Sequence, residues 1–309
     1  DFYVTETNKY ADYILPATTM LERDDLPTIF AACSPVVFAQ STEAVLEPYG
    51  QARQEWEIYA DIARRMGLSL FAAGPLERLN PVLAFLDRKG LTITPRRLMD
   101  MLLRTGPYGD RFGLRRSGLN LKKLRAYPHG VVLAEHAPTG VLDKVVRHPG
   151  GKVRLDPPQI VAEVGRLGTR TDDDPEFPLL AIGIREVRSQ NSWMHNSPTL
   201  MKGDRRHRTR INPRDAGAAG IVDGGRVRIT SRQGQIETDV VITDEVGSGT
   251  VAVPHGWGHR GGWQLANSVP GANVNELTSS RPEDLEQLAG MSVLNGVPVR
   301  IEAVPQRTG

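Results

Sequence analysis

Short apolar stretches with a period of two recur along the second half of the chain. They lie at residues 227–231, 235–243, 250–254 and 297–303, and such alternation is typical of strands that bury one face. Glycine turns separate them, and a short helix is predicted to begin at the capping pair Asn212 and Pro213. A further apolar run, at residues 177–182, predicts one more strand. Several short strands joined by tight turns indicate a β-barrel.

The first half shows helical periodicity alternating with short apolar runs. Apolar positions at helical spacing predict a helix over residues 52–66, closed by Gly67. Further helices are predicted at residues 81–88 and, after the capping pair Thr94 and Pro95, to about residue 104. Residues 1–4 and 13–16 are predicted to be strands. This alternation favours an α/β domain with a parallel sheet.

These patterns divide the chain into three predicted parts. Residues 1–72 are the end of an α/β domain, and residues 73–174 are a helical and irregular insertion with a linker. Residues 175–309 form the β-barrel domain. The glycine- and arginine-rich segment at residues 105–125 could contact phosphate, but we interpret it as a solvated excursion. The boundary near Asp174 follows from the polar, proline-containing stretch at residues 169–175.

Composition excludes several classes of protein. The net charge of +2 over 309 residues gives no reason to expect a nucleic-acid partner, and no apolar run of membrane-spanning length occurs. The single cysteine, Cys33, excludes a disulfide framework and a multi-cysteine metal or iron–sulfur site within these residues. We expect Cys33 to be a small buried hydrophobe and the protein to be cytoplasmic. Because Asp1 already reads as the middle of a domain, we expect a piece of a longer polypeptide.

The most distinctive stretch follows the apolar run at residues 177–182. Gly183 would let the backbone approach a ligand, and a dense polar and aromatic cluster comes after it. Many hydrogen-bonding groups beside one large ring suit a heteroaromatic ligand that carries phosphate. A polar loop anchored to the core by its tryptophan is the alternative. The members of the cluster are Arg185, Ser189, Gln190, Asn191, Ser192, Trp193, His195 and Asn196.

Two other stretches could carry chemistry. Residues 255–262 (His-Gly-Trp-Gly-His-Arg-Gly-Gly) follow a predicted strand and expose backbone N–H groups. His255 and His259 are four residues apart, but the glycines oppose a helix and no acidic third ligand is near, so we predict no metal site. The basic run from Lys202 to Arg210 could surround phosphates or dock an acidic electron partner. We favour solvated surface for it.

The order of these blocks resembles a known family. Residues 183–187 (Gly-Ile-Arg-Glu-Val) with 191–196, residues 211–216 with 220–224, and residues 255–257 with 275–278 resemble the C-terminal cofactor-binding domain of the molybdopterin oxidoreductases. This is the dimethyl sulfoxide reductase and formate dehydrogenase superfamily. Residues 5–7, 11–16, 21–22 and 47–67 resemble its central α/β domain. After Glu22, however, the chain departs from the pattern of many members, and residues 73–172 match only an insertion.

The resemblance implies a fold, a cofactor and a set of contacts. The fold would be a double-psi β-barrel, and the cofactor a bis-molybdopterin guanine dinucleotide with molybdenum or tungsten. A guanidinium such as that of Arg185 can pair with phosphate or pterin oxygens through two hydrogen bonds. The cofactor-binding residues it implies are Arg185, Ser189, Asn191, Ser192, Trp193, His195, Asn196, His255, Gly256, Trp257 and Asn275.

The resemblance also implies what lies elsewhere. The metal-ligating residue and any 4Fe-4S cluster would belong to an upstream part of the same polypeptide, so no catalytic residue is assigned. We expect the cofactor-binding part of an oxidoreductase, inactive alone, with formate dehydrogenase as the candidate type. The whole enzyme would act on a small-molecule substrate and could pass electrons to another subunit. One alternative is a non-catalytic relative that serves as a structural or electron-wiring subunit. Another is a stand-alone barrel that binds proteins, which the α/β half disfavours.

Overall fold

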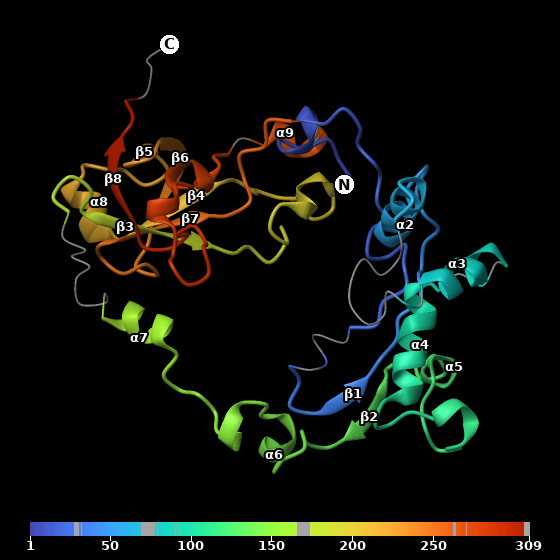
Figure 1. Cartoon of the computed structure of the whole chain (residues 1–309). Coiled ribbons are helices and arrows are strands. Elements are labelled where there is room, and N and C mark those ends of the chain that lie inside the picture. Colours follow the sequence, from blue (N-terminus) through green and yellow to red (C-terminus); the bar gives the residue numbers. More distant parts are fainter. Residues whose placement is uncertain are drawn as a thin grey trace. The chain divides into compact units, whose positions relative to one another are not determined.

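The structure is a computed structural model that describes residues 1–27, 31, 33–68, 78, 80–89, 91, 93–165, 174–261, 264–269 and 271–305. The chain forms two compact units (Figure 1). The first comprises Asp1–Phe2 and Asp12–Gly151, and the second comprises Tyr3–Ala11 and Lys152–Gly309. The three-part division stays a prediction, and most of its polar linker at residues 169–175 lies outside the described residues.

Six strands of the second unit close into a barrel, in the order β3-β7-β4-β6-β5-β8. β3 is parallel to β7 and β4 is parallel to β6, whereas the other neighbouring pairs are antiparallel. Because β8 pairs with both β3 and β5, the barrel has no open edge. This confirms the mixed α/β fold with a closed barrel in its C-terminal part. The strands are β3 (Leu179–Ile184), β4 (Arg208–Ile211), β5 (Arg226–Ser231), β6 (Gln235–Ile242), β7 (Thr250–Pro254) and β8 (Val297–Ala303).

The barrel encloses its own hydrophobic core. Alternate residues of β5 and β6 point inward, as their period of two predicts, and Val227, Ile229 and Val240 are completely buried. The helix α8 (Pro213–Ala218) begins as predicted, because the side chain of Asn212 accepts a hydrogen bond from the N–H of Arg214. The remaining helices of this unit are α7 (Pro158–Val164), α9 (Gln264–Ser268) and the 3-10 turns η1 (Asn8–Tyr10), η6 (Trp193–Asn196), η7 (Val274–Leu277) and η8 (Pro282–Asp284).

β4 was not predicted from the sequence, because it lies inside the basic run. Its residues nevertheless alternate strictly: Thr209 and Ile211 are buried, while Arg208 and Arg210 face outward. The dense arginines concealed a strand whose inward positions are small or apolar. This strand therefore places Arg208 and Arg210 in one outward-facing row on the barrel wall.

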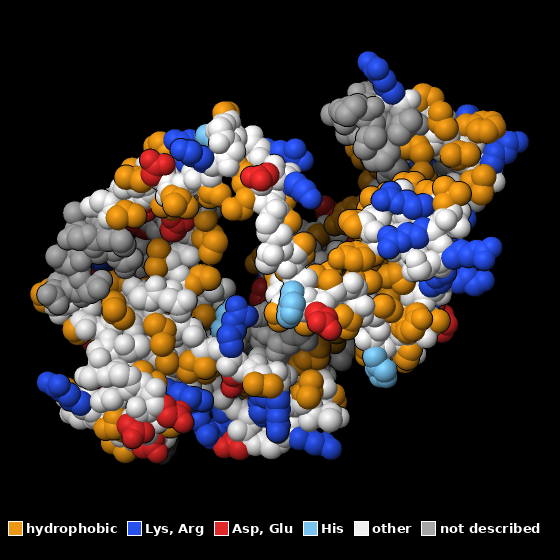
Figure 2. All heavy atoms as spheres, turned by 90° about the horizontal axis from the view of Figure 1, so that it is seen from below, with side chains coloured by type: hydrophobic (Ala, Val, Ile, Leu, Met, Phe, Trp, Pro, Cys, Tyr) orange, Lys and Arg blue, Asp and Glu red, His pale blue; other side chains and the backbone are white. Residues whose placement is uncertain are grey.

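The first unit contains the predicted helices. These are α2 (Glu55–Arg65), α3 (Asn80–Arg88) and α4 (Pro95–Thr105), and the side chain of Thr94 caps α4 as expected. No residue of α2 or α4 is buried, and exposed hydrophobic side chains are visible between Lys and Arg side chains in Figure 2. The unit also contains α5 (Leu121–Leu124), α6 (Leu142–Val145), the 3-10 turns η3 (Arg111–Gly113) and η4 (Pro149–Gly151), and the antiparallel pair β1 (Val37–Ala39) and β2 (Val131–Ala134).

Three predictions at the level of single elements are wrong. Residues 1–4 and 13–16 form no strand, because a strand needs a paired neighbour. The nearest equivalent is one parallel bridge between Ala17 and Arg53, beside which the carbonyl of Pro16 accepts a hydrogen bond from the N–H of Arg53 at 3.1 Å. Cys33 is exposed rather than buried, since it lies in the turn that precedes β1.

Candidate functional site

Two loops emerge side by side from one edge of the barrel. β3 and β7 are parallel neighbours, so their carboxyl ends lie together and the chain leaves both in the same direction. The N–H of His255 extends the pairing by donating to the carbonyl of Ile184 at 2.9 Å. We call residues 185–197 the β3 loop and residues 255–261 the β7 loop. Both blocks in which the sequence predicted cofactor contacts therefore start at adjacent points.

The β3 loop folds through an unusual turn. Ser189 is buried, and both its N–H and its hydroxyl donate to the carbonyl of Glu186, at 3.3 and 3.0 Å. Gln190 and Asn191 then take positive φ values of 43° and 62°, a conformation that residues with a side chain seldom adopt. The strained pair turns the chain into η6. Strain of this kind is concentrated at functional loops.

A glycine of the β7 loop lies directly against this turn. Gly256 has φ 90°, and a Cβ atom on it would lie 2.3 Å from the carbonyl oxygen of Asn191. The guanidinium of Arg185 donates to the side-chain oxygen of Asn191. The structure thus brings together Arg185, Asn191, His255 and Gly256. Gly183 has only an ordinary contact within the protein, at 3.7 Å, whereas Gly256 allows the backbones of the two loops to approach closely. The approach of a ligand to Gly183 stays a prediction.

Trp257 links the two loops through a buried contact. Its side chain is 4% exposed, and its indole N–H donates to the carboxylate of Glu186 at 2.8 Å. Arg205, which precedes β4, lies 3.4 Å from the same carboxylate. The ring centroid of Trp257 is 4.5 Å from that of His195 and 5.8 Å from that of His207. Glu186 therefore joins the β3 loop, the β7 loop and the segment before β4.

The buried histidines of this site are held neutral. Burial, together with the proximity of His259 and Arg205, lowers the pKa of His195 to about 4. His195 Nδ1 and His259 Nε2 are 2.8 Å apart, so one donates to the other. Burial also lowers the pKa of His259 and that of His255, in the latter case together with the charge of Arg185.

Two buried polar atoms of the β3 loop lack a partner among the described residues. They are Nε2 of His195, a side chain only 1% exposed, and Nδ2 of Asn196. The other end of the Asn196 amide accepts from the N–H of Ala266 at 2.8 Å. Buried polar atoms are nearly always paired in folded proteins, so unpaired ones indicate a missing ligand or water. Both atoms belong to η6 in the β3 loop.

Three other residues predicted to contact the cofactor are partly or largely exposed. Ser192 is partly buried at the start of η6. Trp193 is 45% exposed, which disfavours the alternative in which it anchors the loop to the core. Asn275 lies in η7 and is exposed; its N–H bonds to the side chain of Asn273 at 3.1 Å. A Cβ atom on Gly258 would lie 2.3 Å from the N of Asn273, so η7 approaches the β7 loop through its cap.

Sequence reasoning missed Glu186 and His207. Glu186 stands in the sequence only as part of the motif at residues 183–187, and His207 lies within the basic run. His207 Nδ1 accepts from the N–H of Ala272 at 3.3 Å, and its Nε2 is 3.1 Å from the carbonyl of Pro254, so Nε2 is the donor there. Burial lowers the pKa of His207 to about 4. Inward alternation of residues 207, 209 and 211 was the available signal.

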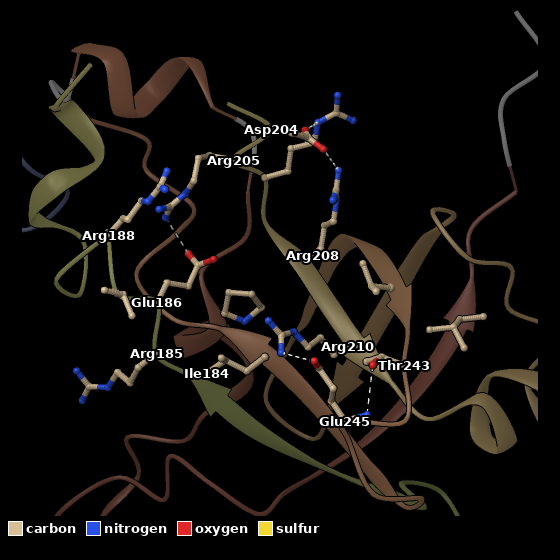
Figure 3. Close-up of a pocket in the computed structure, with 15 residues that line it drawn as sticks. Ile184, Arg185, Glu186, Arg188, Asp204, Arg205, Arg208, Arg210, Thr243 and Glu245 are labelled. Carbon is tan, nitrogen blue, oxygen red and sulfur yellow. Dashed lines mark hydrogen bonds and ion pairs between the residues drawn. The ribbon is translucent and has the colours of Figure 1, made fainter. Parts of the chain in front are cut away.

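A cavity of about 690 Å³ adjoins the β3 loop (Figure 3). We call it the arginine cavity, because six arginines and three carboxylates line it, and we call the apolar part of its lining the floor. Arg210 pairs with Glu245 at 2.7 Å and Arg206 with Asp204 at 2.7 Å. The basic run predicted as solvated surface thus forms much of a concave wall. The cavity is lined by Ile184, Arg185, Glu186, Val187, Arg188, Asp204, Arg205, Arg206, Arg208, Arg210, Val241, Ile242, Thr243, Glu245 and Pro254.

Comparison with known proteins identifies the family. The family described as "Molydopterin dinucleotide binding domain" matches residues 179–295, which include the whole barrel except its last strand, and both loops. The family described as "Molybdopterin oxidoreductase" matches residues 1–65. The chain belongs to the molybdopterin oxidoreductases. Membership implies a molybdopterin cofactor that carries molybdenum or tungsten.

Individual relatives of this molybdopterin oxidoreductase chain point to the dimethyl sulfoxide reductase type. The chain is 26% identical over 283 residues to dimethyl sulfoxide/trimethylamine N-oxide reductase of Rhodobacter capsulatus, covering 87% of this chain and 32% of that protein. It is 24% identical over 304 residues to dimethyl sulfoxide reductase DmsA of Escherichia coli, covering 92% and 35%. The chain therefore spans about a third of the length of these curated relatives.

A solved structure shares the fold. Acetylene hydratase from Pelobacter acetylenicus superposes with a TM-score of 0.64 at 21% sequence identity, over 97% of this chain and 39% of that one. No helix among the described residues is both long enough and apolar enough to cross a membrane.

Proposed function

We propose that the β3 and β7 loops hold the pterin of a bis-molybdopterin guanine dinucleotide in a longer oxidoreductase. The observation that carries this proposal is the close approach of Gly256 to Asn191, because it joins the two predicted contact regions into one surface. The family membership supports the cofactor class. The unpaired polar atoms of His195 and Asn196 support a ligand that itself offers hydrogen-bonding groups.

Each residue has a definite part in this proposal. Arg185, already oriented by Asn191, offers a planar donor fork to phosphate or pterin oxygens. The glycines of the β7 loop leave backbone N–H groups near the ligand without a side chain in between. Because burial holds His195 neutral, its Nε2 can donate or accept one hydrogen bond without placing a charge beside the ligand.

The chain would bind and orient the cofactor rather than react itself. When bound, the metal centre supplies the redox chemistry, and the protein supplies position and electrostatic surroundings. With Cys33 as the single cysteine, these residues cannot ligate an iron–sulfur cluster. A cluster, if the protein has one, and the metal-ligating side chain would come from another part of the polypeptide. A cytoplasmic location and a separate electron-transfer subunit are further parts of the proposal.

The substrate class follows from the relatives. The names of these relatives favour a sulfoxide or an amine N-oxide, a substrate that gives up an oxygen atom. The formate dehydrogenase type expected from the sequence is the second substrate to test. Assays of the full-length protein with dimethyl sulfoxide, trimethylamine N-oxide and formate, using a dye as electron donor or acceptor, distinguish these substrates.

Cofactor content tests the proposed function directly. The full-length protein should purify with about one molybdenum or tungsten per chain together with molybdopterin, measured by elemental analysis and pterin oxidation. Arg185→Gln should lower both contents several-fold, because the amide lacks the charge and the fork. Arg185→Lys should be intermediate, and Arg214→Gln, on the exposed side of α8, should match the wild type.

Two results would contradict the proposal. One is a full-length protein that folds and contains neither metal nor pterin, which would favour the non-catalytic relative. The other is an Arg185→Gln protein with wild-type cofactor content and stability.

A further inference from the structure

The arginine cavity lies outside the surface assigned to the pterin. Of the eleven residues predicted to touch the cofactor, only Arg185 is among its lining residues. Figure 3 shows the side chain of Arg185 reaching away from the cavity, whereas Glu186 and Arg205 face each other beside it. Neighbouring residues of an extended chain point to opposite sides. The β3 loop therefore separates two surfaces.

We propose that the arginine cavity is a second binding site, which takes a small phosphate ester. Two independent features of its lining support this chemistry: an excess of arginines along the wall and an apolar floor. The inference does not depend on the proposed cofactor function, because it concerns residues on the other side of the β3 loop.

The wall carries more positive than negative charge. Apart from Arg185, which reaches away, five arginines face three carboxylates, so two positive charges remain uncompensated among the described residues. Arg188 has no carboxylate partner there. Asp204 pairs with Arg206 and Arg208, and Glu245 pairs with Arg210, so these carboxylates also fix the directions of the guanidinium groups. Planar donor forks held in place suit the several oxygens of a phosphate group.

The barrel determines where these arginines stand. Arg208 and Arg210 are successive outward positions of β4, because Thr209 and Ile211 point into the core. β4 is fixed on both sides, by β6 and by β7. The arginine row is therefore mounted on a rigid strand rather than on a loop, which limits the entropy lost when a ligand is bound.

The floor and the size indicate a small organic ligand. Ile184, Val241, Ile242 and Pro254 supply the apolar part of the lining, the floor. A volume of about 690 Å³ is that of a site for a small molecule. Inorganic phosphate would use only the wall, whereas a phosphate ester with an apolar body would use both wall and floor.

Titration calorimetry on the full-length protein at low salt tests this inference. Phenyl phosphate should bind with a dissociation constant on the order of 0.1–1 mM, more tightly than inorganic phosphate, and the affinity should fall with added salt. The double variant Arg188→Gln/Arg208→Gln should weaken binding at least about tenfold, because it removes two forks. Arg208→Lys should weaken it less, and Arg214→Gln should leave it unchanged. Thermal unfolding confirms that each variant is folded.

Three results would overturn the second site: no saturable binding of phenyl phosphate, equal binding by the folded double variant, or equal affinity for phenyl phosphate and inorganic phosphate. Metal and pterin content are measured on the same samples. If the double variant loses cofactor in step with phenyl phosphate binding, the cavity is part of the cofactor site and the separate site is refuted. If the wild type lacks cofactor but binds phenyl phosphate as expected, the cofactor proposal fails and the second site stands.

Discussion

The β3 and β7 loops start from adjacent parallel strands but reach their shapes by different means. The β7 loop turns at Gly256 and Gly258, whose φ values of 90° and 86° cost glycine little. The β3 loop turns at Gln190 and Asn191, which carry side chains in the left-handed region. One loop is therefore relaxed and the other strained, although they form a single surface.

This difference shows that the β3 loop contributes functional side chains, whereas the glycines of the β7 loop leave room for them. The missing Cβ of Gly256 leaves room for the backbone at Asn191, and that of Gly258 leaves room for Asn273. The β3 loop can then keep functional side chains through its tight turn, with Ser189 and Trp257 bonded to Glu186 on either side. Strain in one loop persists because the other loop packs against it.

The largest expected effect comes from filling the space between the loops. Gly256→Ala should destabilise the protein by about 4 kcal/mol, because the new Cβ meets the Asn191 carbonyl and also requires a positive φ. Gly249→Ala is the matched control: its φ is 84°, but no atom lies within 4 Å of the new Cβ, so about 1–2 kcal/mol is expected. Denaturant unfolding measures both. Equal effects would show that the two loops do not touch.

The next effect concerns the bond that joins the loops. A double-mutant cycle of Glu186→Ala and Trp257→Phe should give a coupling of about 2 kcal/mol, because a buried N–H donates to a carboxylate. The exposed pair Arg300 and Glu302, 3.5 Å apart, should show no measurable coupling. Additive losses in the first cycle would mean that Glu186 does not hold the β7 loop.

Stability should fall as the pH drops from about 6.5 to about 4. Burial lowers the folded-state pKa of His195 to about 4, so in this window the unfolded chain takes up the proton and the folded protein does not. Each such histidine makes the free energy of unfolding change by up to about 1.4 kcal/mol per pH unit. The free energy of unfolding is greatest above about pH 6.5. His195→Gln and His207→Gln should each reduce the number of protons taken up on unfolding by about one, and so flatten the pH dependence. An unchanged slope in His195→Gln would contradict the buried neutral site.

The smallest effect has the opposite sign. Gln190→Gly should stabilise the protein by up to about 1 kcal/mol, because relief of the left-handed strain exceeds the entropy that glycine adds to the unfolded chain. Cofactor content should not change. The same change at Asn191 removes its bond to Arg185 and should lower cofactor content. Destabilisation by Gln190→Gly would indicate that the β3 loop is not strained as described.

The sequence predicted the parts of the fold that depend on local pattern. Strands β5 to β8 follow from alternation, and α8 follows from its cap at Asn212. β4 was missed because arginines occupy its outward positions, and β1 and β2 were missed because their pairing joins residues about 90 positions apart. Local pattern carries no information about such distant partners.

The sequence predicted which segments contribute to the candidate site, but not which of their residues contact one another. That Arg185, Asn191, His255 and Gly256 lie together follows from the parallel pairing of β3 with β7, which no local pattern shows. The role of each site residue toward the cofactor stays a prediction. Glu186 could not be found from the sequence, because a partly exposed glutamate gains its importance only from Trp257 reaching it.

Hydrogen–deuterium exchange on the full-length protein tests the central claim most directly. The cofactor-loaded and cofactor-free forms are compared, with backbone protection measured along the chain. We predict that the cofactor slows exchange most at residues 185–197 and 255–261, and leaves the arginine row of β4 unaffected. Slower exchange elsewhere, with no change in either loop, would contradict the claim that these two loops hold the pterin.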